Sequence, residues 1–156
     1  MLIATGISMQ YSNPDAPLIR FDLAVSWHNI AGVILSLNYL IFLIGNLVTD
    51  NGSFYKITLK GFFASILKQM DYYIRGHFKG EPTPYPVNKK RKFNPLQKLT
   101  YVGAMYVLVP VVILTGVALL FPETIIDKVF AFSGIYLTAL LHGVVGFLLS
   151  LFLVIH

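Results

Sequence analysis

Three of the four histidines in this sequence lie in or beside long apolar stretches: His28, His142 and His156. Ionisable side chains are rare inside membrane segments, and where they occur they commonly serve a function. A lone histidine there also has a plain interpretation, a neutral ring that is hydrogen-bonded to a neighbouring helix. Three histidines in a chain with so few polar residues favour a ligand-binding role.

The spacing of these histidines predicts which of them can meet. His142 and His156 are 14 positions apart, so on one helix they differ by about 40° around the axis and by about 21 Å along it. His28 lies near the start of another apolar stretch, which we expect to cross the membrane in the same direction as the last one. His28 and His142 are therefore predicted to lie at a similar depth.

Two histidines that face each other in a helix bundle are suitable axial ligands for a b-type haem. A zinc site would need more ligands, and no Cys, Asp or Glu stands near either histidine in the apolar stretches. Gly32 and Gly146 each follow a histidine by four residues, one turn deeper on the same face. Bare backbone there would admit a flat porphyrin, although small residues also simply allow helices to pack closely.

Composition predicts that long membrane helices carry these residues. Hydrophobic residues make up 56% of the 156 residues and charged residues 12%, against about 25% charged in soluble chains. About 20 apolar residues cross a bilayer as a helix. Three expected helices are long enough, and a shorter apolar segment resembles the end of a fourth whose beginning is missing. In chain order the expected segments are 1–9, 23–48, 99–122 and 131–156.

The expected fold is thus a single all-α transmembrane domain over 1–156, a bundle of the four-helix type with a partial first helix. The abrupt apolar ends suggest a sequence cut at both ends. There are no cysteines, which excludes disulfides, iron–sulfur ligation by this sequence and covalent haem attachment.

The distribution of basic residues predicts the topology. Ten of the twelve Lys and Arg lie in the segment 49–99, and loops rich in these residues stay in the cytoplasm. The ten are Lys56, Lys60, Lys68, Arg75, Lys79, Lys89, Lys90, Arg91, Lys92 and Lys98. We therefore expect a multi-pass protein of the bacterial inner membrane with this loop inside. The basic charge needs no nucleic acid to explain it.

The cytoplasmic loop has structure of its own. Over 57–75 apolar residues recur about every fourth position, which predicts an amphipathic helix lying on the membrane lipid. A proline-rich linker follows, and then Asn94-Pro95, the pattern of a helix start. A short internal echo also occurs: 2–6 (LIATG) resembles 112–116 (VILTG).

The order of the histidines, the Thr-Gly pairs, the Gly80-Glu81-Pro82 stretch and the segment 92–101 (KFNPLQKLTY) together carry a family resemblance. The chain resembles the cytochrome b subunit of thiosulfate reductase. More broadly, it resembles the formate dehydrogenase gamma and nickel-hydrogenase cytochrome b superfamily. The resemblance covers nearly the whole length.

This resemblance implies two stacked b haems that pass electrons between quinone and an iron–sulfur or molybdenum subunit on the outer face, where the substrate chemistry resides. His28 and His142 would hold the outer haem. His156 would hold one side of the inner haem, whose other ligand lies in the missing first helix, so one site is complete and one partial. Asn94 matches an asparagine of the quinone site, whereas Leu96 replaces a glycine found in formate dehydrogenase relatives.

Two other functions remain open at this point. The chain could be a structural membrane anchor subunit without haem, in which the histidines only pack. It could also be a transporter with histidine proton relays. A transporter predicts broken helices and charges near the midplane, and the apolar stretches contain no carboxylate or lysine.

Overall fold

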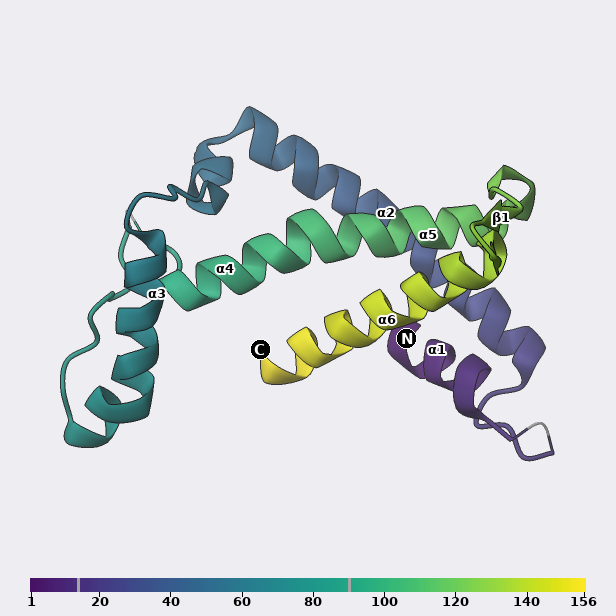
Figure 1. Ribbon diagram of the computed structural model, residues 1–156, viewed down its shortest axis with the longest axis horizontal. Coiled ribbons are helices and arrows are strands. Elements are labelled where there is room, and N and C mark those ends of the chain that lie inside the picture. The colour runs from purple at the N-terminus through teal and green to yellow at the C-terminus, as the bar shows by residue number, and fades with distance from the viewer. Residues whose placement is uncertain (14, 90) are drawn as a thin grey trace. The chain divides into compact units, whose positions relative to one another are not determined.

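Three helices in the computed structural model are long and apolar enough to cross a bilayer (Figure 1). These candidate spans are Phe21–Val48, Pro95–Leu120 and Gly134–Ile155. The structure describes residues 1–13, 15–89 and 91–156. Pro14 and Lys90, one of the ten loop cations, lie outside the described residues. The family resemblance and the apolar pattern predicted a helical membrane protein, and the described chain is mostly helical with these three spans.

The first and third spans are each one helix, α2 (Phe21–Val48) and α6 (Gly134–Ile155). The second span joins α4 (Pro95–Gly103), a π-helical stretch (Ala104–Leu108) and α5 (Val109–Leu120). Pro110 stands at the start of α5. Proline has no N–H to donate and its ring crowds the preceding turn, which accounts for the altered hydrogen bonding just before it.

The second span begins four residues earlier than the expected 99–122, because a capping box starts it. The Asn94 side chain accepts from the backbone N–H of Gln97, and the Gln97 side chain accepts from the backbone N–H of Asn94. These two bonds satisfy donors that a helix end would otherwise leave unpaired. Pro95 stands at the first helical position, where the fixed φ angle of proline already matches that of a helix.

The chain divides into two compact units, of which the first comprises Met1–Phe42 and Tyr106–His156. It contains α1 (Leu2–Tyr11), and both α1 and α5 contact α6. A small hairpin of β1 (Lys128–Val129) and β2 (Phe132–Ser133) joins α5 to α6, with Val129 opposite Phe132. This hairpin delays the last helix to Gly134, three residues later than the expected 131–156.

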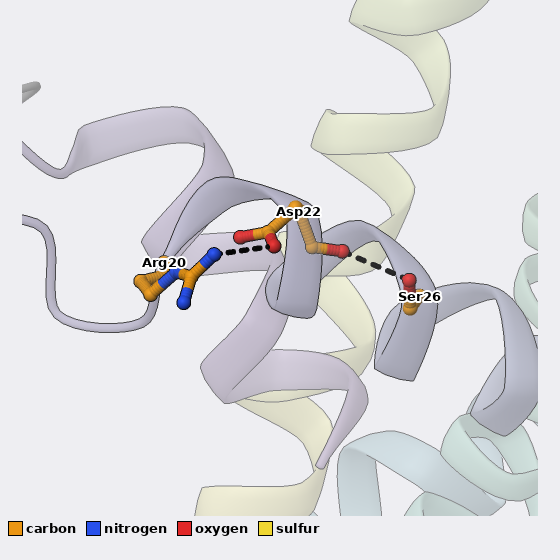
Figure 2. Close-up of polar contacts among 3 residues, drawn as sticks. All are labelled: Arg20, Asp22 and Ser26. Atoms are coloured by element: carbon orange, nitrogen blue, oxygen red, sulfur yellow. Dashed lines mark hydrogen bonds and ion pairs between the residues drawn. The ribbon is translucent and has the colours of Figure 1, made fainter.

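The polar start of α2 is held by local contacts, which Figure 2 shows. Arg20 Nη2 pairs with Asp22 Oδ2 at 2.8 Å, and Ser26 Oγ donates to the backbone carbonyl of Asp22 at 2.9 Å. Asp22 lies in the first turn, where a negative charge is favoured by the helix dipole. From Leu23 onward α2 contains no further charged residue, so this pair marks one end of the apolar span.

The second unit is Leu43–Met105. It contains a 3-10 turn (Asp50–Tyr55), α3 (Phe62–Asp71) and a π turn (Tyr72–Gly76). The α-helix is shorter than the expected 57–75, because the chain turns at Gly61 with a positive φ of 76°. α3 packs against α4 and buries Ile66 and Gln69.

The other side of α3, together with Ile74 of the π turn that follows it, exposes a stripe of apolar side chains. Phe63 is 71% exposed, Leu67 51%, Met70 42% and Ile74 65%. The helical period places these four within about 60° of each other, beside the buried face and next to the charged one. The helix therefore has two apolar faces, one that packs within the unit and one that stays exposed in this unit.

Candidate functional site

The structure brings His28 on α2 and His142 on α6 together. Their ring centres lie 6.1 Å apart, and the ring planes are inclined by 70°. Both side chains are half-buried. The two histidines are more than a hundred positions apart in the sequence, so the meeting of their rings is a property of the folded unit.

His28 is supported by α1. The hydroxyl oxygen of Thr5 lies 2.9 Å from Nδ1 of His28, and Thr5 is 2% exposed. The backbone of Gly6 faces the same ring, since a Cβ on Gly6 would lie 3.6 Å from Cε1 of His28. One short helix thus supplies a hydrogen-bond partner and a bare surface to the imidazole.

His142 is supported in the same way by α5. The hydroxyl oxygen of Thr115 lies 3.0 Å from Nδ1 of His142, and Thr115 is 9% exposed. A Cβ on Gly116 would lie 3.1 Å from Cε1 of His142, closer than ordinary van der Waals contact. A Thr-Gly pair on an adjacent helix therefore holds each member of the histidine pair.

The spacing of the two rings suits a metal held between them. An imidazole nitrogen binds a metal at about 2 Å, so two histidines that share one metal place their ring centres about 6 Å apart. Among the described residues, no group of three or more His, Cys, Asp or Glu side chains converges as a metal site. Two facing histidines match a haem, in which the porphyrin supplies the remaining four ligands.

Gly32 and Gly146 leave open space one turn beyond the two histidines. A Cβ at either position would meet no other heavy atom within 4 Å. These positions have the bare, unobstructed backbone that a flat ring beside the histidines requires. The residues present therefore fit a haem, by the facing imidazoles and by the space next to them.

His156 lies apart from the facing pair. It is the C-cap of α6, about 21 Å along the helix axis from His142, and its ring stacks on Phe152 with centres 5.3 Å apart. His77, the fourth histidine, lies exposed in the second unit, against Tyr72 and Phe78.

Asn94 is buried in the second unit, with 7% of its surface exposed. Its side-chain oxygen caps α4 by accepting from the Gln97 N–H at 2.9 Å, and its nitrogen donates to the Tyr73 hydroxyl at 2.9 Å. Both ends of the amide are therefore engaged within the unit. Tyr73 itself is 47% exposed, so the contact lies near the surface of this unit.

Comparison with known proteins decides the family of this arrangement. The model of the prokaryotic cytochrome b561 family matches residues 1–156, the whole chain. The chain belongs to the prokaryotic cytochrome b561 family. The resemblance to nickel-hydrogenase cytochromes b drawn from the sequence is thereby confirmed. The expectation of a membrane protein of a cytochrome b family is likewise confirmed.

A curated relative agrees with the family. The chain is 36% identical over 127 residues to a protein of Escherichia coli (strain K12) named "Putative cytochrome YdhU". The match covers 81% of this chain and 48% of that relative, so the chain spans about half the length of the relative. No solved structure matches this chain.

Two residues that contact the histidine pair, Thr5 and Thr115, were not predicted as site residues from the sequence. The sequence did carry a signal, the echo between 2–6 and 112–116, whose Thr-Gly pairs turn out to face the two histidines. A Thr-Gly pair followed 23 or 27 residues later by a histidine is the local pattern of each half-site.

Proposed function

We propose that this chain carries one b-type haem between His28 and His142 and uses it to pass electrons between the quinone pool and an extracytoplasmic partner subunit. The facing rings, 6.1 Å apart on α2 and α6, carry the proposal. Gly32 and Gly146 would leave room for the porphyrin, and Thr5 and Thr115 would hold the imidazoles. When bound, the haem supplies a one-electron redox couple; the chain supplies its ligands and an apolar surrounding.

In this proposal, the two sites that exchange electrons through the haem are the quinone pool and a partner subunit. The partner, an iron–sulfur or molybdenum subunit on the outer face, would perform the substrate chemistry. The basic segment 49–99 would lie in the cytoplasm of a bacterial cell, since Lys and Arg are retained on that side of the inner membrane. The end of α2 that carries Arg20 and Asp22 would then face outward.

The exposed apolar stripe of α3 supports a place for this helix on the inner lipid surface. Phe63, Leu67, Met70 and Ile74 are all more than two-fifths exposed, and a helix with one such stripe beside a charged face binds at the lipid interface. Burial of four large apolar side chains in lipid would be favourable, because each removes apolar area from water.

Two further residues belong to the proposal at its inner side. His156 would serve as one ligand of a second haem, about four helical turns from His142. Asn94 would lie beside the quinone site, where its side-chain nitrogen donates to the Tyr73 hydroxyl. The capping bonds already explain the conformation of Asn94. An experiment on Asn94 variants must therefore separate a loss of quinone contact from a loss of helix capping.

A reduced-minus-oxidised absorption spectrum of the purified protein tests the proposal. We expect the bands of a low-spin b-type haem, which require two strong axial ligands. A structural anchor subunit without haem would show no such difference spectrum, and that result would overturn the proposal. Protein purified after growth with added haem precursor should be used, so that a low cofactor supply does not limit occupancy.

A further inference from the structure

Thr5 and Thr115 occupy matching places around the histidine pair. Each lies on a helix next to that of its histidine, and its hydroxyl oxygen is within 3.0 Å of Nδ1. Each is followed by a glycine that faces the same ring. Both side chains are buried. A Thr-Gly pair therefore contacts each histidine in the same way, with the threonine at Nδ1 and the glycine near Cε1, although the helices involved are different.

The other contacts of each hydroxyl favour one direction of the hydrogen bond. Thr115 Oγ1 lies 2.7 Å from the carbonyl oxygen of Val111, one turn earlier on α5. A carbonyl oxygen can only accept, and two oxygens this close need a proton between them. The single hydroxyl proton of Thr115 is therefore donated to its own helix, and a lone pair faces Nδ1 of His142.

Thr5 has the same arrangement. Its Oγ1 lies 3.1 Å from the carbonyl oxygens of Met1, the N-cap of α1, and Leu2 in the first turn. In the arrangement that these acceptors favour, they take the hydroxyl proton and the hydroxyl oxygen accepts from Nδ1 of His28. If the hydroxyl donated to Nδ1 instead, its oxygen would face carbonyl oxygens with no proton between them, which is costly in an apolar setting.

A neutral imidazole carries a proton on one of its two nitrogens. When Nδ1 donates to threonine, that proton is on Nδ1, and Nε2 keeps the lone pair that can bind iron. The opposite tautomer would place the proton on Nε2 and block ligation. The hydrogen bond that the other nitrogen makes thus decides which nitrogen is available.

We infer that Thr5 and Thr115 are positioning residues that hold His28 and His142 as Nδ1-protonated imidazoles with Nε2 available to iron. This inference rests on the proposed function for the identity of the bound group, but the tautomer itself exists without haem. A partner that accepts the second N–H of a ligating histidine makes the ligand more basic. Stronger donation favours the ferric state, so the two threonines lower the midpoint potential of the haem.

The test uses valine variants, because valine keeps the shape of threonine and lacks the hydroxyl. Thr5→Val and Thr115→Val remove the acceptor, and Thr5→Ser and Thr115→Ser restore it. Thr138→Val is the matched control, since Thr138 on α6 donates to the Gly134 carbonyl at 2.8 Å in the same manner. Two readouts are taken: 15N NMR of histidine-labelled protein without haem, and the midpoint potential of the haem-loaded protein.

In the unmodified protein we expect His28 and His142 to be protonated at Nδ1. Each valine variant should weaken this preference at its own histidine, where the backbone carbonyl of Leu2 or Val112 remains as an acceptor. It should also raise the midpoint potential and lower haem affinity about 10-fold. The serine variants and Thr138→Val should behave like the unmodified protein. Protonation at Nε2 in the unmodified protein would overturn the inference, and so would valine variants indistinguishable from Thr138→Val. If the unmodified protein bound no haem, the proposed function would fail, while the NMR result would still decide the tautomer.

Discussion

Gly116 and His142 are in such close contact that a methyl group on Gly116 would stand 3.1 Å from Cε1 of the His142 ring. The corresponding distance from Gly6 to His28 is 3.6 Å, an ordinary van der Waals separation. Both histidines are therefore flanked by a Thr-Gly pair, but only Gly6 has room for an added methyl group. On the α5 side, a methyl group would fit only if the ring moved by a few tenths of an ångström.

This difference predicts unequal effects of two alanine substitutions. Gly116→Ala should push the His142 ring by a few tenths of an ångström, because core atoms cannot overlap, and lower haem affinity about 10-fold. Gly6→Ala should change haem affinity little. Haem titration of the purified variants measures both. Equal effects would mean that the contact at Gly116 does not constrain His142. Gly143→Ala, at a helical glycine with open space around it, controls for the general effect of replacing glycine by alanine in a helix.

Substitution of the histidines should separate ligands from bystanders. His28→Ala and His142→Ala should each abolish the low-spin spectrum of the haem between them, since six-coordinate iron needs both imidazoles. His77→Ala should leave the spectrum unchanged, as His77 lies exposed in the other unit. His156→Ala should leave this haem intact as well, because His156 is about 21 Å from His142 along α6. Absorption and EPR spectra of membranes with matched protein content provide the measurement. Retention of the low-spin signal in either His28→Ala or His142→Ala would disprove the ligand assignment.

The proposed topology predicts opposite labelling of two single cysteines. The chain has no cysteine of its own, so each introduced thiol is unique. A cysteine at Lys89, in the basic segment, should resist a membrane-impermeant thiol reagent in intact cells, and one at Glu123 should react. Both positions are exposed in the structure. After the cells are opened, both should react, which controls for access. Labelling of the Lys89 site in intact cells would reverse the orientation.

Asn94 allows helix capping and quinone contact to be measured apart. Asn94→Ala removes the capping oxygen and should destabilise the protein by about 1 kcal/mol. Asn94→Asp keeps a capping oxygen of similar strength and loses the amide donor to Tyr73. We expect Asn94→Asp to retain thermal stability and to slow quinol-linked haem reduction. Unchanged kinetics in Asn94→Asp, together with the stability loss in Asn94→Ala, would restrict Asn94 to capping. Tyr73→Phe tests the hydroxyl side of the same contact.

The apolar spans and the position of the histidines on them were predictable from the sequence, because both depend on local runs of residues. The start of α4 was also readable, since Asn94 and Pro95 act within one helical turn. The later start of α6 was not foreseen. Val129 pairs with Phe132 across a tight turn in which Phe130 adopts a φ of 55°, a conformation that the apolar pattern does not signal.

The amphipathic character of α3 was predictable, but the division of its apolar residues was not. The period placed Ile66 and Met70 on one face, whereas the structure buries Ile66 and leaves Met70 42% exposed. Burial depends on which side of the helix α4 covers, and that is decided by tertiary packing.

The sequence by itself determined that this chain has membrane-spanning helices with histidines at defined places, because helix length and residue position along a helix follow from local sequence. The tertiary structure decided which side chains meet around those histidines. Contacts between Thr5 and His28, and between Thr115 and His142, depend on how neighbouring helices are rotated about their axes and how closely their backbones approach. Gly6 and Gly116 permit that approach, and the buried hydroxyls then set the orientation of each ring.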